Sequence, residues 1–223
     1  MKTPFKTSIR PMSNARSFLV LCALGAAALL GGCAAQAPSL AYQGPAQAGA
    51  LSGHVVCATI DFKGADFAQF HVTKDHPQHN GDYVMQPQEL GGVYGDEIVS
   101  AVRQEGATIT TDCSKADLLI HTVMQPTAGH KHLVWTQYQL GKSAAMSLIP
   151  LTHSRYYTQY DQIDEHVTAT LKGQAPKSVD IKLAQVVPYK STTLATGAQT
   201  MDDMKIYRDL QAKAVQKVLP LLP

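Results

Sequence analysis

The stretch "GGVYGDEIVSAVRQEGATITT" (91–111) predicts a helix that ends at a glycine and leads directly into a strand. Its apolar residues recur at three- and four-residue steps and so share one helical face: Tyr94, Ile98, Ala101 and Val102. Gly106 supplies a stop at the C-terminal end of the helix, since glycine adopts the left-handed conformation that ends helices. A helix followed at once by the strand "ATITT" (107–111) indicates a domain that mixes α and β structure.

Segments on either side of this unit predict the strands of a sheet. "HVVCATIDF" (54–62) precedes it and "ADLLIHTVMQ" (116–125) follows it, and both are short, apolar and rich in β-branched residues. Three later segments alternate apolar with polar residues, as strands with one solvated face do: 132–140, 165–173 and 178–187. We expect these later strands to form a meander.

The C-terminal stretch "TMDDMKIYRDLQAKAVQKVLPLLP" (200–223) predicts a second helix. Thr200 and Asp203 have the spacing of an N-cap and its N3 partner. The apolar stripe of this helix comprises Met204, Tyr207, Leu210, Ala214 and Val218. The expected fold is therefore α+β, with a single antiparallel or mixed sheet and about two packed helices, over residues 54–223.

Residues 1–32 have the layout of a signal peptide. They contain no acidic residue and four basic ones, Lys2, Lys6, Arg10 and Arg16. The apolar run 18–30 that follows is too short to span a bilayer comfortably. Translation starts at Met1 or at Met12, which opens a shorter peptide with a more usual charged head. Removal of this segment takes four of the 19 Lys and Arg and leaves 15 against 17 Asp and Glu.

The sequence Leu30-Gly31-Gly32-Cys33 resembles the lipobox of bacterial lipoproteins. The resemblance implies that diacylglycerol is joined to the Cys33 thiol, that the peptide is cut before Cys33, and that an acyl chain such as palmitate is added to the new amino group. More than one acyl chain gives stable membrane anchoring. Two alanines follow Cys33, whereas an Asp there favours inner-membrane retention in enteric-type lipoproteins. The resemblance therefore implies an outer-membrane location; the alternative for Cys33 is a small buried thiol.

Residues 33–53 are expected to form the lipidated cysteine and a flexible tether, because they are rich in Ala, Gln, Gly and Pro. The domain 54–223 then lies in the periplasm. A second, looser resemblance concerns "GKSAAMSLIPLTHSRYYTQY" (141–160), which is similar to small α/β lipoproteins of unknown function that have a Leu-x-Pro turn before a Tyr-rich strand.

Two cysteines remain after processing. Cys22 leaves with the signal peptide and Cys33 takes the lipid, so Cys57 and Cys113 are left in an oxidising compartment. We expect a disulfide between them, and two buried thiols are the alternative. The sequence has no C-x-x-C pair, which argues against catalytic redox chemistry.

Two histidine-rich segments are the candidates for a metal site, "DHPQHN" (75–80) and "GHKH" (129–132). Neutral imidazole is a common ligand of Zn²⁺ and Cu²⁺. The candidate ligands are Asp75, His76, His79, His130 and His132. Nothing in the sequence brings the two segments together, so the favoured interpretation is a turn-rich surface loop and a separate segment that leads into a strand.

No motif for catalysis is present. The sequence has no G-x-S-x-G elbow and no complete phosphate loop, and the carboxylates of Asp161, Asp164 and Glu165 are typical of a solvated rim. Nucleic acid is not expected as a partner, because no cluster of Lys and Arg remains after processing. Several aromatic residues are of the kind enriched in protein interfaces, although strand packing also explains them: Trp135, Tyr138, Tyr156, Tyr157 and Tyr160.

We therefore expect a non-enzymatic lipoprotein with a structural, assembly or accessory role, anchored to the membrane by its lipid and bound to another envelope protein. No cofactor is expected apart from the covalent acyl chains on Cys33. The alternative is a periplasmic ligand- or metal-binding lipoprotein built on the histidine pairs.

Overall fold

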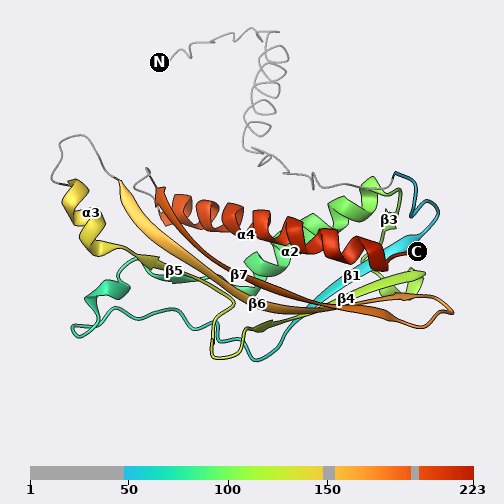
Figure 1. Ribbon diagram of the computed structural model, residues 1–223, viewed down its shortest axis with the longest axis horizontal. Helices are drawn as coiled ribbons and strands as arrows, with labels where there is room; N and C mark the ends of the chain where they lie inside the picture. The colour runs from blue at the N-terminus through green and yellow to red at the C-terminus, as the bar shows by residue number, and fades with distance from the viewer. Residues whose placement is uncertain (1–47, 148–153, 192–195) are drawn as a thin grey trace, which may run out of the picture. The chain divides into compact units, whose positions relative to one another are not determined.

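The structure is a computed structural model that describes residues 48–147, 154–191 and 196–223 (Figure 1). Its strands form one sheet in the order β2-β5-β6-β4-β1-β3, with β7 paired to β6. The strands are β1 (Val55–Phe62), β2 (Tyr83–Val84), β3 (Thr108–Ile109), β4 (Leu118–Pro126), β5 (Val134–Tyr138), β6 (Arg155–Leu171) and β7 (Lys177–Ser191). The sheet is mixed and the class is α+β, which confirms the fold expected from the sequence.

Two long helices lie on the same face of this sheet (Figure 1). They are α2 (Pro87–Gln104) and α4 (Thr196–Val218), and they pack against each other as well as against strands. A shorter helix, α3 (Leu140–Ser147), follows β5. Single 3-10 turns are η1 (Pro77–His79), η2 (Cys113–Lys115) and η3 (Leu219–Leu221). None of the helices in the described ranges is both long and apolar enough to cross a bilayer.

Strand β6 organises the sheet. β7 pairs antiparallel with it along nearly its whole length, from the Arg155–Ser191 pair to the Ala169–Lys177 pair. On the other edge of β6, β5 pairs with the first part and β4 with the second part. β4 and β5 therefore lie end to end along β6, and residues 127–133 leave the sheet between them.

The two edges of β4 differ in direction. β4 is antiparallel to β6 but parallel to β1, and β1 is also parallel to β3. Parallel neighbours need a long crossover, and here the chain between β1 and β4 includes α2. The meander expected for the later strands is present as β5-β6-β7.

The helical faces predicted from the sequence are the faces that the structure buries. The predicted face of α2 is fully buried against the sheet, and in α4 the buried members of the predicted stripe are Tyr207, Leu210, Ala214 and Val218. Met204 is only partly buried. α2 ends just before Gly106, whose φ is +95°. The N-cap expected at Thr200 is wrong, because α4 already begins at Thr196.

Cys57 on β1 and Cys113 in η2 form a disulfide, as expected from the sequence, with their Cα atoms 5.2 Å apart. The bond ties β1 to the turn that precedes β4. Leu51, which lies in the stretch 33–53 suggested as a tether, is fully buried, and its N–H donates to the Glu105 carbonyl at 2.8 Å. The expected signal peptide and the lipidation site Cys33 lie outside the described residues.

Candidate functional site

The two faces of the sheet carry different residues. On β6, alternate side chains are buried under the helices, as Ile163 and Val167 are. Figure 1 shows α2 and α4 on that side only. The intervening β6 side chains are half-buried or exposed on the opposite side, which we call the open face: Thr158, Tyr160, Gln162, Asp164, His166 and Thr168.

A row of large side chains crosses the open face. Trp135 on β5 and Tyr160 on β6 are register partners, and their rings stack with centroids 5.0 Å apart and an interplanar angle of 9°. On the other side of Tyr160, its register partner is Val186 on β7, which is 55% exposed. Aromatic and aliphatic side chains therefore continue across three strands. The solvent-facing side of such a sheet usually carries polar residues instead.

The histidines extend this row beyond the sheet. The rings of His130 and His132 lie with their centroids 5.7 and 6.1 Å from that of Trp135. Phe70 is in edge contact with His132 at 5.2 Å and stacks on His79 at 5.3 Å, and His76 lies 5.3 Å beyond His79. We call the whole set the aromatic band: Phe70, His76, His79, His130, His132, Trp135, Tyr160 and Val186.

The structure thus corrects the interpretation of the two histidine segments as unrelated. "DHPQHN" does form a surface turn, with η1 inside it, and "GHKH" does lead into β5. They meet because the loop between β1 and β2 folds back along residues 127–133. Phe70 in that loop provides the contact, and no periodicity marks Phe70 in the sequence, so the sequence interpretation missed it.

Hydrogen bonds hold this loop in place. The Asp66 N–H donates to the Lys131 carbonyl at 2.8 Å, and His132 Nδ1 donates to the Asp66 carbonyl at 2.7 Å. His79 Nδ1 lies 2.9 Å from Asp82 Oδ2, and the other oxygen of Asp82 accepts from the Tyr138 N–H at 2.7 Å. The band is therefore fixed at both of its loop segments.

The candidate metal ligands are near one another but do not form a ligand set. In the described ranges no three His, Cys, Asp or Glu side chains are placed to share one ion. Asp75 is exposed and takes no part in the contacts of the band. His79 and His132 each bond an oxygen through Nδ1, the arrangement that orients metal-binding histidines.

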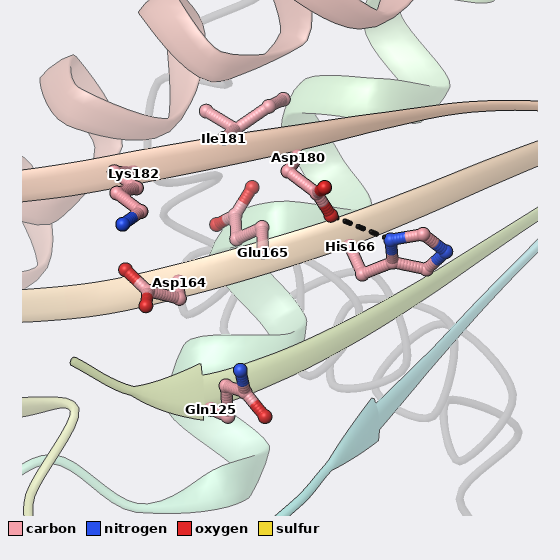
Figure 2. Close-up of a pocket in the computed structure, with 7 residues that line it drawn as sticks. All are labelled: Gln125, Asp164, Glu165, His166, Asp180, Ile181 and Lys182. Atoms are coloured by element: carbon pink, nitrogen blue, oxygen red, sulfur yellow. Dashed lines mark hydrogen bonds and ion pairs between the residues drawn. The ribbon is translucent and has the colours of Figure 1, made fainter. Parts of the chain in front are cut away.

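A second feature of the open face is a charged hollow of about 280 Å³ (Figure 2). It spans three strands and is lined by Gln125, Asp164, Glu165, His166, Asp180, Ile181 and Lys182. His166 Nδ1 and Asp180 Oδ1 pair across β6 and β7 at 2.6 Å, both largely exposed, as the dashed line in Figure 2 marks. Both signs of charge meet here, so the hollow has no clear preference for an anion or a cation.

Three carboxyl groups lie buried between α4 and the sheet. Asp161 accepts hydrogen bonds from Gln159 and Gln185, and Glu165 accepts one from Gln211 on α4. Asp203 on α4 accepts a hydrogen bond from the Tyr189 hydroxyl. All three acids are at most 2% exposed. The interpretation of Asp161 and Glu165 as a solvated rim is therefore wrong, whereas Asp164 does lie on the open face.

Burial is the main reason why these acids bind protons tightly. It raises the pKa of Asp161 to about 6 and the pKa values of Glu165 and Asp203 to about 7, against the opposing effect of the bonds that they accept. Glu165 Oε2 and Asp203 Oδ2 have no hydrogen-bond partner among the described residues. A buried site with an unpartnered oxygen favours the neutral, protonated form of the carboxyl group.

Comparison with known proteins gives structural likenesses only. No family model matches the chain, and no curated protein matches it. A protein of Xanthomonas campestris from the family DUF330 is 10% identical, with a TM-score of 0.40, and the match covers 80% of this chain and 89% of that one.

Two further likenesses are to lipoproteins. Rare lipoprotein B of Shewanella oneidensis is 8% identical with a TM-score of 0.28, over 74% of this chain and 91% of that one. Uncharacterized lipoprotein B of Nitrosomonas europaea is 11% identical with a TM-score of 0.31, over 79% and 86%. None of these values assigns the chain to a family.

Proposed function

We propose that this chain is a lipid-anchored protein of the bacterial envelope, attached to the outer membrane through Cys33, whose periplasmic domain binds another envelope protein through the aromatic band. Its role in this proposal is structural, assembly-related or accessory, and not enzymatic. The lipobox-like sequence Leu30-Gly31-Gly32-Cys33 supports the anchor. The band supports the binding role.

The observation that carries the binding role is the row Trp135–Tyr160–Val186 on the open face. Contiguous exposed apolar side chains mark interaction surfaces, and Trp and Tyr are enriched in the cores of protein interfaces. The surrounding loops are hydrogen-bonded rather than loose, so the surface is already ordered before a partner binds. A preorganised surface loses less conformational entropy on binding.

Crosslinking in living cells tests this proposal. A photo-crosslinking amino acid at position 186 is expected to capture one defined envelope protein, and Trp135→Ala is expected to abolish that capture. The matched control is position 213, because Lys213 is exposed on α4, away from the open face. Equal capture from positions 186 and 213, or capture that persists in Trp135→Ala, would contradict the proposal.

Metal binding is a second candidate function, favoured by one observation. His79 and His132 flank Phe70, and neither Nε2 atom has a hydrogen-bond partner among the described residues. Calorimetric titration with Zn²⁺ separates the candidates. Micromolar or tighter binding that is lost in both His79→Ala and His132→Ala would favour the metal site, and the same test in His76→Ala and His130→Ala would define the remaining ligands.

A further inference from the structure

A cavity of about 330 Å³ lies where α3 meets the ends of β6 and β7. It is distinct from the aromatic band and from the charged hollow of Figure 2. The lining residues that matter here are Gln139, Lys142, Tyr156, Thr158, Pro188 and Lys190. This volume is within the range of small-molecule sites.

The strand register determines how β6 and β7 contribute to the cavity. Tyr156 pairs with Lys190, and Thr158 pairs with Pro188. Residues two apart on a strand point to the same side, so these four side chains share one side of the ladder. An aromatic ring and a proline ring therefore stand diagonally, with a lysine and a threonine beside them.

Hydrogen bonds from Gln139, the residue before helix α3, and to Ser143 within it hold the helix against this ladder. The Gln139 N–H donates to the Tyr156 carbonyl at 2.8 Å, and the Tyr156 N–H donates to Ser143 Oγ at 3.0 Å. Gln139 Nε2 also donates to Thr158 Oγ1 at 3.2 Å. These bonds fix the first turn of α3, which contains Lys142, as a wall of the cavity.

The charge of the lining is entirely positive. It contains Lys142 and Lys190 and no Asp or Glu. Neither lysine has an ion-pair partner within the described ranges. Arg155, a third cation, lines a smaller cavity of about 140 Å³ that shares Tyr157 with this one. In the processed chain acidic residues outnumber basic ones. The positive charge at this end of the sheet is therefore opposite in sign to the net charge of the processed chain.

We propose that this cavity binds a small organic anion with a flat apolar body, whose anionic group pairs with Lys142 and Lys190 and whose body lies against Tyr156 and Pro188. The apolar rings supply contact area that inorganic phosphate or sulfate cannot use. The two lysine ammonium groups attract an anion and so favour it over cations and neutral molecules. The site shares no residue with the aromatic band, and it adjoins the band on the open face through Thr158 and Pro188.

Titration with 4-methylbenzenesulfonate, followed by NMR shifts of the backbone amides in the mature lipidated protein in non-ionic detergent, tests this inference. Saturable shifts are expected at Tyr156 and Lys190, with an affinity that weakens when salt is raised from about 20 to about 300 mM. The double variant Lys142→Ala/Lys190→Ala is expected to bind at least about fivefold more weakly. Lys142→Arg/Lys190→Arg keeps both charges and should retain binding.

Two controls make the result decisive. Lys182→Ala removes a lysine from the same strand β7 but outside this cavity, and it is expected to leave the affinity unchanged. Benzyltrimethylammonium has a similar body and the opposite charge, and it is expected not to bind. Equal binding of the cation, an unchanged affinity in the double alanine variant, or no saturable shift at millimolar concentration would each overturn the inference.

Discussion

Trp135 and Tyr160 stack across β5 and β6 on the open face of the sheet, at a centroid distance of 5.0 Å. Trp135 is the only tryptophan in the chain, so its fluorescence reports on this surface alone. Trp135 is also in ring contact with His130 and His132, but both rings of the pair are half-buried rather than part of the core, so part of their surface is left available to a partner.

A double-mutant cycle with Trp135→Ala and Tyr160→Ala should give a coupling free energy of unfolding of about 0.5–1.5 kcal/mol, the range for a stacked aromatic pair. Urea denaturation of the four proteins measures it, with circular dichroism as the probe because the tryptophan is removed in two of them. A coupling near zero would mean that the two rings do not interact in solution.

The disulfide should contribute a large part of the free energy of unfolding of the domain. Cys57 and Cys113 are 56 residues apart, and in the chain-entropy model closing such a loop stabilises the fold by about 4 kcal/mol. We expect Cys57→Ala/Cys113→Ala to lower the free energy of unfolding by up to this amount. Alkylation without reductant provides the independent check, since labelling of both thiols in the wild-type chain would contradict the bond.

Lipidation at Cys33 has a direct test. We expect Cys33→Ala to remain uncleaved by the lipoprotein-specific peptidase and to be lost from the outer-membrane fraction, because the thiol is the acceptor of the lipid in the motif that the sequence resembles. Mass spectrometry of the N-terminus measures cleavage and lipidation, and membrane fractionation measures the loss from the outer membrane. An unmodified N-terminus at any other residue would contradict the anchor, and Cys22→Ala, a change within the expected signal peptide, is the control.

Helix α2 and the hydrophobic strands could be predicted from the sequence, because the apolar residues that each element buries recur at the spacing typical of a helix or of a strand. Ile98 on α2 and Ile120 on β4 are examples, and both are fully buried. The start of β6 could not be predicted correctly from the sequence. The pattern predicts a strand from residue 165, whereas β6 begins at Arg155. Gln159, Asp161 and Glu165 face the core there, so the usual alternation of buried apolar and exposed polar residues is absent.

The aromatic band could be predicted only in part. Its histidines stand out by residue type, but their approach to Trp135 depends on the path of the loop between β1 and β2. That path is set by long-range bonds such as the one from His132 to the Asp66 carbonyl, 66 positions apart. No local propensity encodes a contact of this kind.

The buried acids give the fold a defined dependence on pH. Glu165 and Asp203 have folded-state pKa values of about 7, above the values near 4 that carboxyls have in unfolded chains. The folded state therefore binds more protons than the unfolded state between about pH 4 and 7. The stability that these groups contribute is fully present below about pH 4 and is lost as the pH rises through about 7.

Glu165→Gln should remove part of this dependence, because the amide cannot ionise beneath α4. Ionising Glu165 costs on the order of 3 kcal/mol more in the folded state than in the unfolded chain, so we expect the melting temperature at about pH 8 to rise by several degrees and to change little at about pH 4. Thermal melts of both proteins across this range measure the effect. Asp164→Asn is the matched control, since it makes the same acid-to-amide change at the adjacent residue of β6, whose side chain lies on the open face and not beneath α4. A profile of Glu165→Gln that runs parallel to that of the wild-type chain would show that Glu165 is not the group whose ionisation opposes the packing of α4.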